Sequence, residues 1–160
     1  MNVNTVIGNL YTGEKKFVSV KLNEYIEKII SSNTDTFLTT FHLFNKFPFL
    51  KKHIDYKDIK KNSIIHSLLS WIGPKSTIIG FHTDWAENIN VQVRGSKVFY
   101  LVSPKYNKNM YPSPTYKRFY IVSLVDMKSL NRKKFPLFEE GEIIKVVLEA
   151  GDAIYLPREW

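Results

Sequence analysis

The stretch N-I-N-V-Q-V-R-G-S-K-V-F-Y-L-V-S-P, residues 88–104, decides the fold class of this sequence. It holds two runs of apolar and β-branched residues separated by Gly95 and Ser96, a pattern typical of two short strands joined by a turn. Because no helical periodicity separates these runs, we expect a β-sandwich or a β-barrel. Similar runs recur at 64–73, 76–82, 119–125, 142–151 and 152–157.

The residues before this β-rich part have a different texture. The segment 21–32, K-L-N-E-Y-I-E-K-I-I-S-S, has apolar residues at helical spacing and predicts an amphipathic helix. The segment 36–41 predicts a short strand, and 41–61 predicts short helical turns around Pro48. We therefore expect one structural domain, in which a helical and mixed segment 1–63 packs on a β-barrel core formed by 64–160.

Composition narrows the possible chemistry. The chain has 160 residues, no cysteine, and 23 Lys and Arg against 15 Asp and Glu, which gives a net charge of +8. The lack of cysteine excludes disulfides, thiolate zinc sites and cysteine nucleophiles, so a metal would have to use His and carboxylate ligands. No apolar run reaches the ~18 residues of a membrane helix, and no signal peptide is evident, so we expect an intracellular protein, cytoplasmic or nuclear.

Several features that suggest chemistry have simpler explanations. The glycines of Gly8–Gly13 have the spacing of a phosphate-binding loop, but Glu14 and Lys15 stand where Lys and Ser or Thr are required. His42, His53 and His66 occur singly among aromatic, basic or aliphatic residues, where packing or surface roles are expected.

His82 and Asp84 form the most informative pair. Residues two apart in an extended chain project to the same side, so an imidazole and a carboxylate can meet at one point. One carboxylate and two histidines form the facial triad of non-haem Fe(II) oxygenases, which leaves coordination positions open for a cosubstrate and dioxygen. A His-x-Asp sequence alone is common, and its bland alternative is a surface pair at a strand end.

The sequence around this pair resembles the JmjC-type 2-oxoglutarate oxygenases of the cupin superfamily. It is similar in particular to the asparaginyl hydroxylase that inhibits the hypoxia-inducible factor, to arginyl-hydroxylase relatives and to tRNA wybutosine hydroxylases. The resemblance covers roughly residues 37–160. Its motifs are W-I-G-P at 71–74, H-T-D at 82–84, Asn88, Q-V-x-G-x-K at 92–97, Y-L-V-S-P at 100–104 and L-E-A-G-D-A-I-Y-L-P at 148–157.

The resemblance implies a fold and a role for several residues. The fold would be mainly β, a double-stranded β-helix (jelly-roll or cupin) with an α-helical N-terminal part, incomplete at its C-terminus. His82 and Asp84 would be the catalytic Fe(II) ligands. Lys97 would pair with the distal carboxylate of the cosubstrate 2-oxoglutarate, and Asn88 would hydrogen-bond near that cosubstrate. A buried cation suits such a diacid, because a charge-assisted hydrogen bond contributes ~1.5–3 kcal/mol.

The sequence departs from the family pattern in three places. The third iron ligand of the family, a His, follows the motif that ends here at Trp160, so we expect either a fragment of a longer product or a truncated protein. Ile79 stands where relatives have Thr or Ser, and Phe37 where they have Tyr. At ~1 kcal/mol for each lost hydrogen bond, cosubstrate binding would weaken very roughly tenfold to a hundredfold.

Three functions are compatible with these observations. The first is an Fe(II)- and 2-oxoglutarate-dependent hydroxylase, a dioxygenase acting on a protein side chain. The second is a tRNA-base hydroxylase of the wybutosine type, for which the charge of +8 and Lys51, Lys52, Lys60 and Lys61 would supply RNA contacts. The third is a catalytically inactive cupin-like binding module, which Ile79, Phe37 and the missing His would favour.

Overall fold

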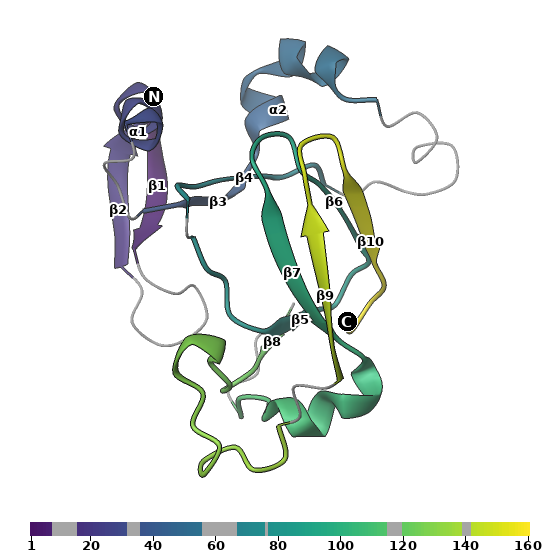
Figure 1. The fold of residues 1–160 in the computed structure, drawn as a ribbon. Helices are drawn as coiled ribbons and strands as arrows, with labels where there is room; N and C mark the ends of the chain where they lie inside the picture. Colours follow the sequence, from purple (N-terminus) through teal and green to yellow (C-terminus); the bar gives the residue numbers. More distant parts are fainter. Residues whose placement is uncertain (8–15, 32–35, 56–66, 76, 115–119, 139–141) are drawn as a thin grey trace. The chain divides into compact units, whose positions relative to one another are not determined.

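The computed structural model describes residues 1–7, 16–31, 36–55, 67–75, 77–114, 120–138 and 142–160. Within it the chain divides into two compact units, Met1–Ile78 and Ile79–Trp160. Both units are mainly β-strand with short helices, as Figure 1 shows. Among the described residues, no helix is long and apolar enough to cross a membrane.

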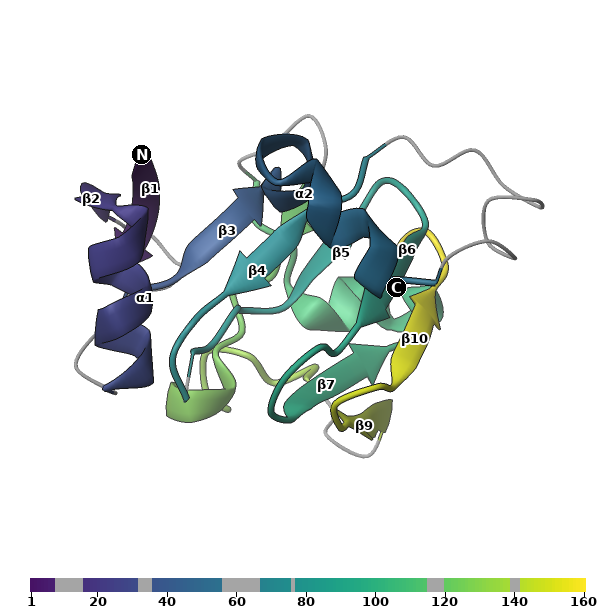
Figure 2. The same cartoon turned by 90° about the horizontal axis from the view of Figure 1, so that it is seen from above.

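The first unit contains two antiparallel strand pairs and one amphipathic helix. Strand β1 pairs with β2, and β3 pairs with β4, which Figure 2 shows side by side. The predicted helix and the predicted strand 36–41 are both confirmed, and the region around Pro48 forms short helical turns. The elements are β1 (Asn2–Ile7), β2 (Lys16–Lys21), α1 (Leu22–Ile30), β3 (Leu38–Phe41), α2 (Leu43–Lys46), η1 (Pro48–His53) and β4 (Ser70–Ile72).

The core of this unit joins α1 to the strands. Val3, Tyr25 and Leu38 are buried together, and the apolar side of α1 packs against them. The Tyr25 hydroxyl donates to the backbone carbonyl of Ile72 at 2.8 Å, which links the helix to β4. Burial raises the pKa of Tyr25 to about 12, so the hydroxyl keeps its proton and this bond at neutral pH.

The second unit is built from three antiparallel pairs. Strand β5 pairs with β8, β6 with β10, and β7 with β9. The elements are β5 (His82–Asp84), β6 (Asn88–Val91), β7 (Lys97–Val102), η2 (Pro104–Met110), β8 (Tyr120–Val122), η3 (Met127–Ser129), β9 (Ile143–Leu148) and β10 (Ala153–Leu156). A core of Val125, Phe135 and Phe138 lies between β8 and β9 along the chain.

The turns predicted at Gly95 and Gly151 are confirmed. Both glycines have positive φ, 70° and 103°, which residues with a side chain adopt at a cost. The β9–β10 turn is also bonded to the end of β6, since Gly151 N–H donates to the Gln92 carbonyl at 2.8 Å. Gln92 N–H in turn donates to the Asp152 carbonyl at 2.9 Å, and these two bonds hold the chain where β6 ends.

The structure adds a hairpin that the sequence analysis did not predict. Strands β1 and β2 pair over six residues each, and the segment that joins them, 8–15, lies outside the described residues. The predicted boundary between 63 and 64 also lies outside them. Strand β4 groups with the first unit because it pairs with β3.

Candidate metal and cosubstrate site

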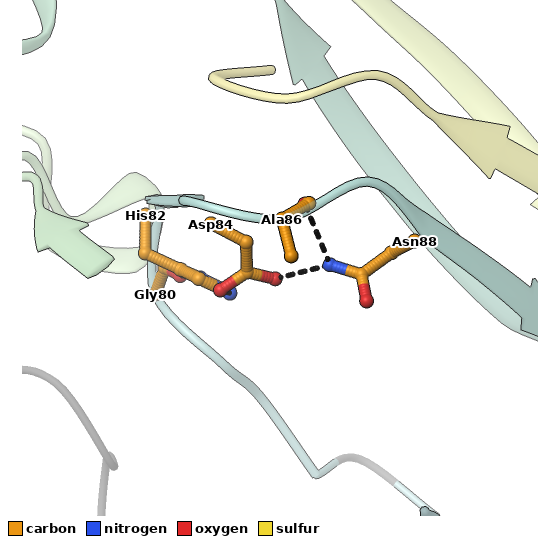
Figure 3. A network of polar contacts seen from close by, with 5 residues as sticks. All are labelled: Gly80, His82, Asp84, Ala86 and Asn88. Carbon is orange, nitrogen blue, oxygen red and sulfur yellow. Dashed lines mark hydrogen bonds and ion pairs between the residues drawn. The ribbon is translucent and has the colours of Figure 1, made fainter. Parts of the chain in front are cut away.

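Strand β5 carries His82 and Asp84 at its two ends. The strand is short, but its pairing with β8 sets His82 opposite Val122 and Asp84 opposite Tyr120. A further bond from Ser123 N–H to the Phe81 carbonyl, 2.9 Å long, extends this ladder by one step. The extended backbone therefore places both side chains on one side, as the His-x-Asp spacing predicts, and Figure 3 shows them next to each other.

The imidazole of His82 is oriented by the backbone carbonyl of Gly80, two residues earlier. Its Nδ1 lies 2.9 Å from the Gly80 carbonyl oxygen, and because a carbonyl only accepts, Nδ1 carries the proton and donates. This tautomer places the lone pair on Nε2, the nitrogen that lies 3.9 Å from Asp84 Oδ1. A histidine held through one ring nitrogen and facing a carboxylate with the other is arranged as metal ligands usually are.

The carboxylate of Asp84 is held from its other side. Asn88 Nδ2 donates to Asp84 Oδ2 at 2.8 Å, and it lies 3.5 Å from the Ala86 carbonyl oxygen, as Figure 3 shows. The Asp84 side chain is 43% exposed and that of His82 is 24% exposed, so the pair is accessible to a ligand. The two carboxylate oxygens thus face different partners, Asn88 and His82.

The spacing of the His82 and Asp84 atoms fits a bound divalent ion. Two metal–ligand bonds of ~2.1 Å span at most ~4.2 Å, so one ion can contact both atoms across 3.9 Å. A small side-chain rotation would bring them to the ~3 Å expected for adjacent ligands of an octahedral ion. Over the parts of the chain that the structure describes, no group of three His, Cys, Asp or Glu could hold a metal, so His82 and Asp84 can offer at most two ligands.

Lys97 begins β7 and lies on its half-buried face together with Phe99. Its Nζ is 4.6 Å from the centroid of the Phe99 ring, and within the described residues no carboxylate pairs with it. Burial lowers the pKa of Lys97 from its ordinary value of 10.5. A partly dehydrated ammonium packed on an aromatic ring is a favourable partner for an anionic ligand.

The structure brings three of the four predicted site residues into one network. His82, Asp84 and Asn88 are linked through the contacts described above, whereas no hydrogen bond or ion pair among the described residues joins Lys97 to them. Sequence reasoning missed that Asn88 contacts Asp84 and that Gly80 orients His82. The only signal in the sequence was the short spacing: Asn88 follows Asp84 by four residues, and Gly80 precedes His82 by two.

Ile79 and Phe37 are the two positions at which the resemblance leads us to expect a hydroxyl group. Ile79 begins the second unit and is half-buried. Phe37 is 3% exposed in the first unit, where its backbone exchanges two hydrogen bonds with Val6. A cavity of about 310 Å³ also lies in the first unit, between β1 and β3, and none of the four predicted site residues lines it.

Comparison of the sequence with known proteins identifies a family and several relatives. A family model described as a cupin-like domain matches residues 4–160. The chain is 32% identical to JmjC domain-containing protein D of Dictyostelium discoideum, 28% identical to lysine-specific demethylase 8 of Danio rerio and 28% identical to human tRNA wybutosine-synthesizing protein 5. These matches cover 94%, 96% and 72% of the chain but only 38%, 39% and 35% of the relatives, so the chain spans well under half of their length.

Proposed function

We propose, from the premise that the chain belongs to the cupin-like JmjC domain family, that it is an Fe(II)- and 2-oxoglutarate-dependent hydroxylase of a protein side chain. Members of this family are typically 2-oxoglutarate-dependent oxygenases. The observation that carries the proposal is the pair His82 Nε2 and Asp84 Oδ1, which face each other across 3.9 Å. An imidazole and a carboxylate in this arrangement supply two of the three ligands of a facial triad.

The third iron ligand that we propose is a histidine that closely follows Trp160 in the gene product, as the resemblance implies. The backbone of this segment reaches the metal-ligand strand, because Glu159 N–H donates to the Asp84 carbonyl at 3.2 Å. A side chain that follows Trp160 closely would therefore start from the immediate neighbourhood of Asp84. The strand pairs β5–β8, β6–β10 and β7–β9 agree with a double-stranded β-helix, which we propose as the complete fold.

Each residue of this site then has a defined task. His82 and Asp84 would hold the ion. Lys97 would pair with the distal carboxylate of 2-oxoglutarate, and this ion pair would offset the free-energy cost of removing that carboxylate from water. When bound, ferrous iron supplies the activation of dioxygen, through which 2-oxoglutarate becomes succinate and carbon dioxide while one oxygen atom enters a C–H bond of the substrate. The protein holds that C–H bond near the metal and keeps bulk water out.

A protein substrate is favoured by the relatives. Three of them are named lysine-specific demethylases, and those from Danio rerio and Xenopus tropicalis match 96% of this chain at 28% identity. Their names refer to a protein side chain as the site of reaction. We therefore propose that the reaction oxidises a C–H bond in an amino-acid side chain of a polypeptide.

The proposal is tested by succinate formation from 2-oxoglutarate in the presence of Fe(II), measured on the gene product that contains this sequence. We expect His82→Ala and Asp84→Ala to abolish it, because each removes one of the ligands. His53→Ala is the matched control, since His53 is exposed in η1 of the first unit, and it should retain full turnover. Turnover that survives His82→Ala would contradict the proposal.

A tRNA substrate is the second candidate, and a specific observation favours it. The chain is 28% identical over 115 residues to human tRNA wybutosine-synthesizing protein 5, and it carries a net charge of +8. Lys51 and Lys52 are exposed in η1, whereas Lys60 and Lys61 lie outside the described residues. Binding to tRNA that weakens steeply with salt and is lost in Lys51→Glu/Lys52→Glu would support this substrate, and salt-insensitive binding would remove it.

A catalytically inactive binding module is the third candidate, because Ile79 and Phe37 lack the hydroxyl groups of relatives. It predicts no succinate, and no thermal stabilisation by Mn(II) together with N-oxalylglycine, an unreactive analogue of 2-oxoglutarate. An increase in melting temperature with both ligands, absent in Asp84→Ala, would argue against this module.

A further inference from the structure

Asn88 makes a contact that defines a role different from the one that the sequence predicts for it. Its Nδ2 donates to Asp84 Oδ2 at 2.8 Å. Because a carboxylate only accepts hydrogen bonds, the amide nitrogen has to face Asp84, which settles the orientation of the Asn88 side chain. We propose that Asn88 is a positioning residue, which holds one oxygen of Asp84 so that the other is presented as a single-oxygen metal ligand; this inference rests on the proposed metal site.

The geometry of Asp84 supports this division between its two oxygens. Oδ2 is bonded to Asn88, and Oδ1 lies 3.9 Å from His82 Nε2. The Asp84 side chain is 43% exposed, so without this bond its carboxylate could rotate in water. A carboxylate can bind a metal through one oxygen or through both, and a bond that occupies Oδ2 favours the first mode.

Binding through one oxygen matters for this particular chemistry. A facial triad leaves three positions of an octahedral ion open, and 2-oxoglutarate and dioxygen together fill them. A carboxylate that bound through both oxygens would occupy one of these positions. By holding Oδ2, Asn88 would keep the coordination position free for the cosubstrate or dioxygen. The same bond already restricts the Asp84 side chain, so less conformational entropy would be lost when Asp84 binds the ion.

The bond to Asp84 limits the hydrogen bonds that Asn88 can donate directly to the cosubstrate. The Nδ2 group has two N–H bonds; one donates to Asp84, and Ala86 O lies 3.5 Å from the same nitrogen. The remaining polar atom of the side chain, Oδ1, only accepts, and so do both carboxylates of 2-oxoglutarate. While Asn88 holds Asp84, only its second N–H bond, the one that lies toward the Ala86 carbonyl, is left to donate to the cosubstrate.

The pair of His82 and Asp84 is consequently preorganised within one short segment. His82 is oriented by the carbonyl of Gly80, and Asp84 by the amide of Asn88, so each ligand has a hydrogen-bond partner from the same stretch of the sequence. Figure 3 shows the bond between Asp84 and Asn88. Partners of this kind are worth about 10- to 100-fold in metal affinity in other proteins. We expect Asn88 to act through Asp84 on metal affinity, with little effect on the binding of cosubstrate.

Mn(II) affinity, measured by the electron paramagnetic resonance signal of the free ion, tests this role. Asn88→Leu removes the amide donors at nearly constant size and should weaken Mn(II) binding about 10- to 100-fold. Asn90→Leu is the matched control, because Asn90 lies two residues further on the same half-buried face of β6, and it should change binding less than about threefold. At saturating Mn(II), the affinity for 2-oxoglutarate should change less than about threefold in both variants.

A metal-free measurement keeps the inference separable from the proposed function. In the apo protein, the side-chain amide protons of Asn88 should exchange with solvent more slowly than those of Asn90, and Asp84→Ala should abolish the difference. Equal exchange rates in the unsubstituted protein would overturn the role of Asn88, whether or not the protein binds metal. A loss of 2-oxoglutarate affinity at unchanged Mn(II) affinity in Asn88→Leu would overturn it too, whereas absent Mn(II) binding combined with slow exchange would count against the proposed metal site alone.

Discussion

The two faces of β6 have the opposite polarity from that of an ordinary sheet, whereas those of β7 are mixed. The half-buried face of β6 carries Asn88 and Asn90, and its exposed face carries Ile89 and Val91. In β7, Lys97 lies on the half-buried face beside Phe99, and Val98 and Tyr100 are exposed. In a sheet that only had to fold, the polar residues would face water and the apolar residues the core. Burying polar groups costs free energy, and Asn88 and Lys97 are the half-buried polar residues for which we propose a role in ligand binding.

The exposed face shows the same inversion in the paired strands. Val98 lies opposite Val147, and Ile89 lies opposite Tyr155, which is 53% exposed. Exposed apolar pairs of this kind form no part of the proposed chemistry. The comparison therefore predicts that substitutions of Asn88 and Lys97 change ligand binding, and that substitutions of the exposed apolar residues do not.

The largest effect is expected for Lys97→Met. Loss of the ammonium should weaken 2-oxoglutarate binding about 10- to 100-fold, because a hydrogen bond to a charged group contributes ~1.5–3 kcal/mol. The same substitution should raise the melting temperature of the apo protein, since it removes the unfavourable burial of a charge. Calorimetric titration and thermal unfolding measure the two effects, and unchanged 2-oxoglutarate affinity would show that Lys97 serves only packing on Phe99.

The second effect is a dependence on pH. Burial lowers the pKa of Lys97 from 10.5, so its ammonium loses its proton earlier than an ordinary lysine, and 2-oxoglutarate affinity should fall by up to about tenfold for each pH unit above the lowered pKa. Between the lowered pKa and 10.5 the unfolded chain binds more protons at this residue, so its contribution makes stability rise with pH. The pH dependence of affinity and that of stability should both be absent in Lys97→Met. An unsubstituted protein whose 2-oxoglutarate affinity is constant up to pH 10.5 would contradict the role of Lys97 in binding the cosubstrate.

A smaller effect, a gain of affinity, is expected for Ile79→Thr. This half-buried position lacks the hydroxyl of relatives, and a restored hydrogen bond of ~1 kcal/mol should tighten 2-oxoglutarate binding about fivefold. Ile79→Val is the control for the loss of volume, because it removes apolar atoms without adding a donor. Equal affinities of the Thr and Val variants would show that position 79 does not contact the cosubstrate.

The smallest effect is expected on the exposed face. Val98→Thr/Val147→Thr replaces an exposed apolar pair and should leave both Mn(II) and 2-oxoglutarate affinities unchanged, with a stability change within about 0.5 kcal/mol. Titration and denaturant unfolding would measure these quantities. A loss of ligand affinity similar to that of Lys97→Met would remove the distinction between the two faces.

Strong periodicity made parts of the fold predictable from the sequence. The helix α1 and the strands that follow residue 64 carry clear apolar patterns, and the turns at Gly95 and Gly151 carry residues that tolerate positive φ. The hairpin β1–β2 was missed because its strands mix apolar with polar residues, N-V-N-T-V-I and K-F-V-S-V-K. The burial of Val3 and Val6 depends on tertiary packing that no local pattern encodes.

The candidate site was predictable in its residues but not in its bonds. The spacing of His82 and Asp84 predicts that the two side chains meet, and the structure brings them together. The bond between Asn88 and Asp84 depends on the path of residues 85–87 between β5 and β6, which the sequence pattern does not specify. The roles of His82, Asp84, Asn88 and Lys97 in binding a metal and a cosubstrate stay predictions.

Paramagnetic broadening by Mn(II) tests the metal site most directly. In nuclear magnetic resonance spectra of the gene product, the ring protons of His82 and the side-chain amide of Asn88 should broaden at substoichiometric Mn(II), while the ring protons of His42 and His53 stay sharp. Asp84→Ala should remove the selective broadening of His82. Equal broadening of all three histidines, or none at saturating Mn(II), would contradict a metal site at His82 and Asp84.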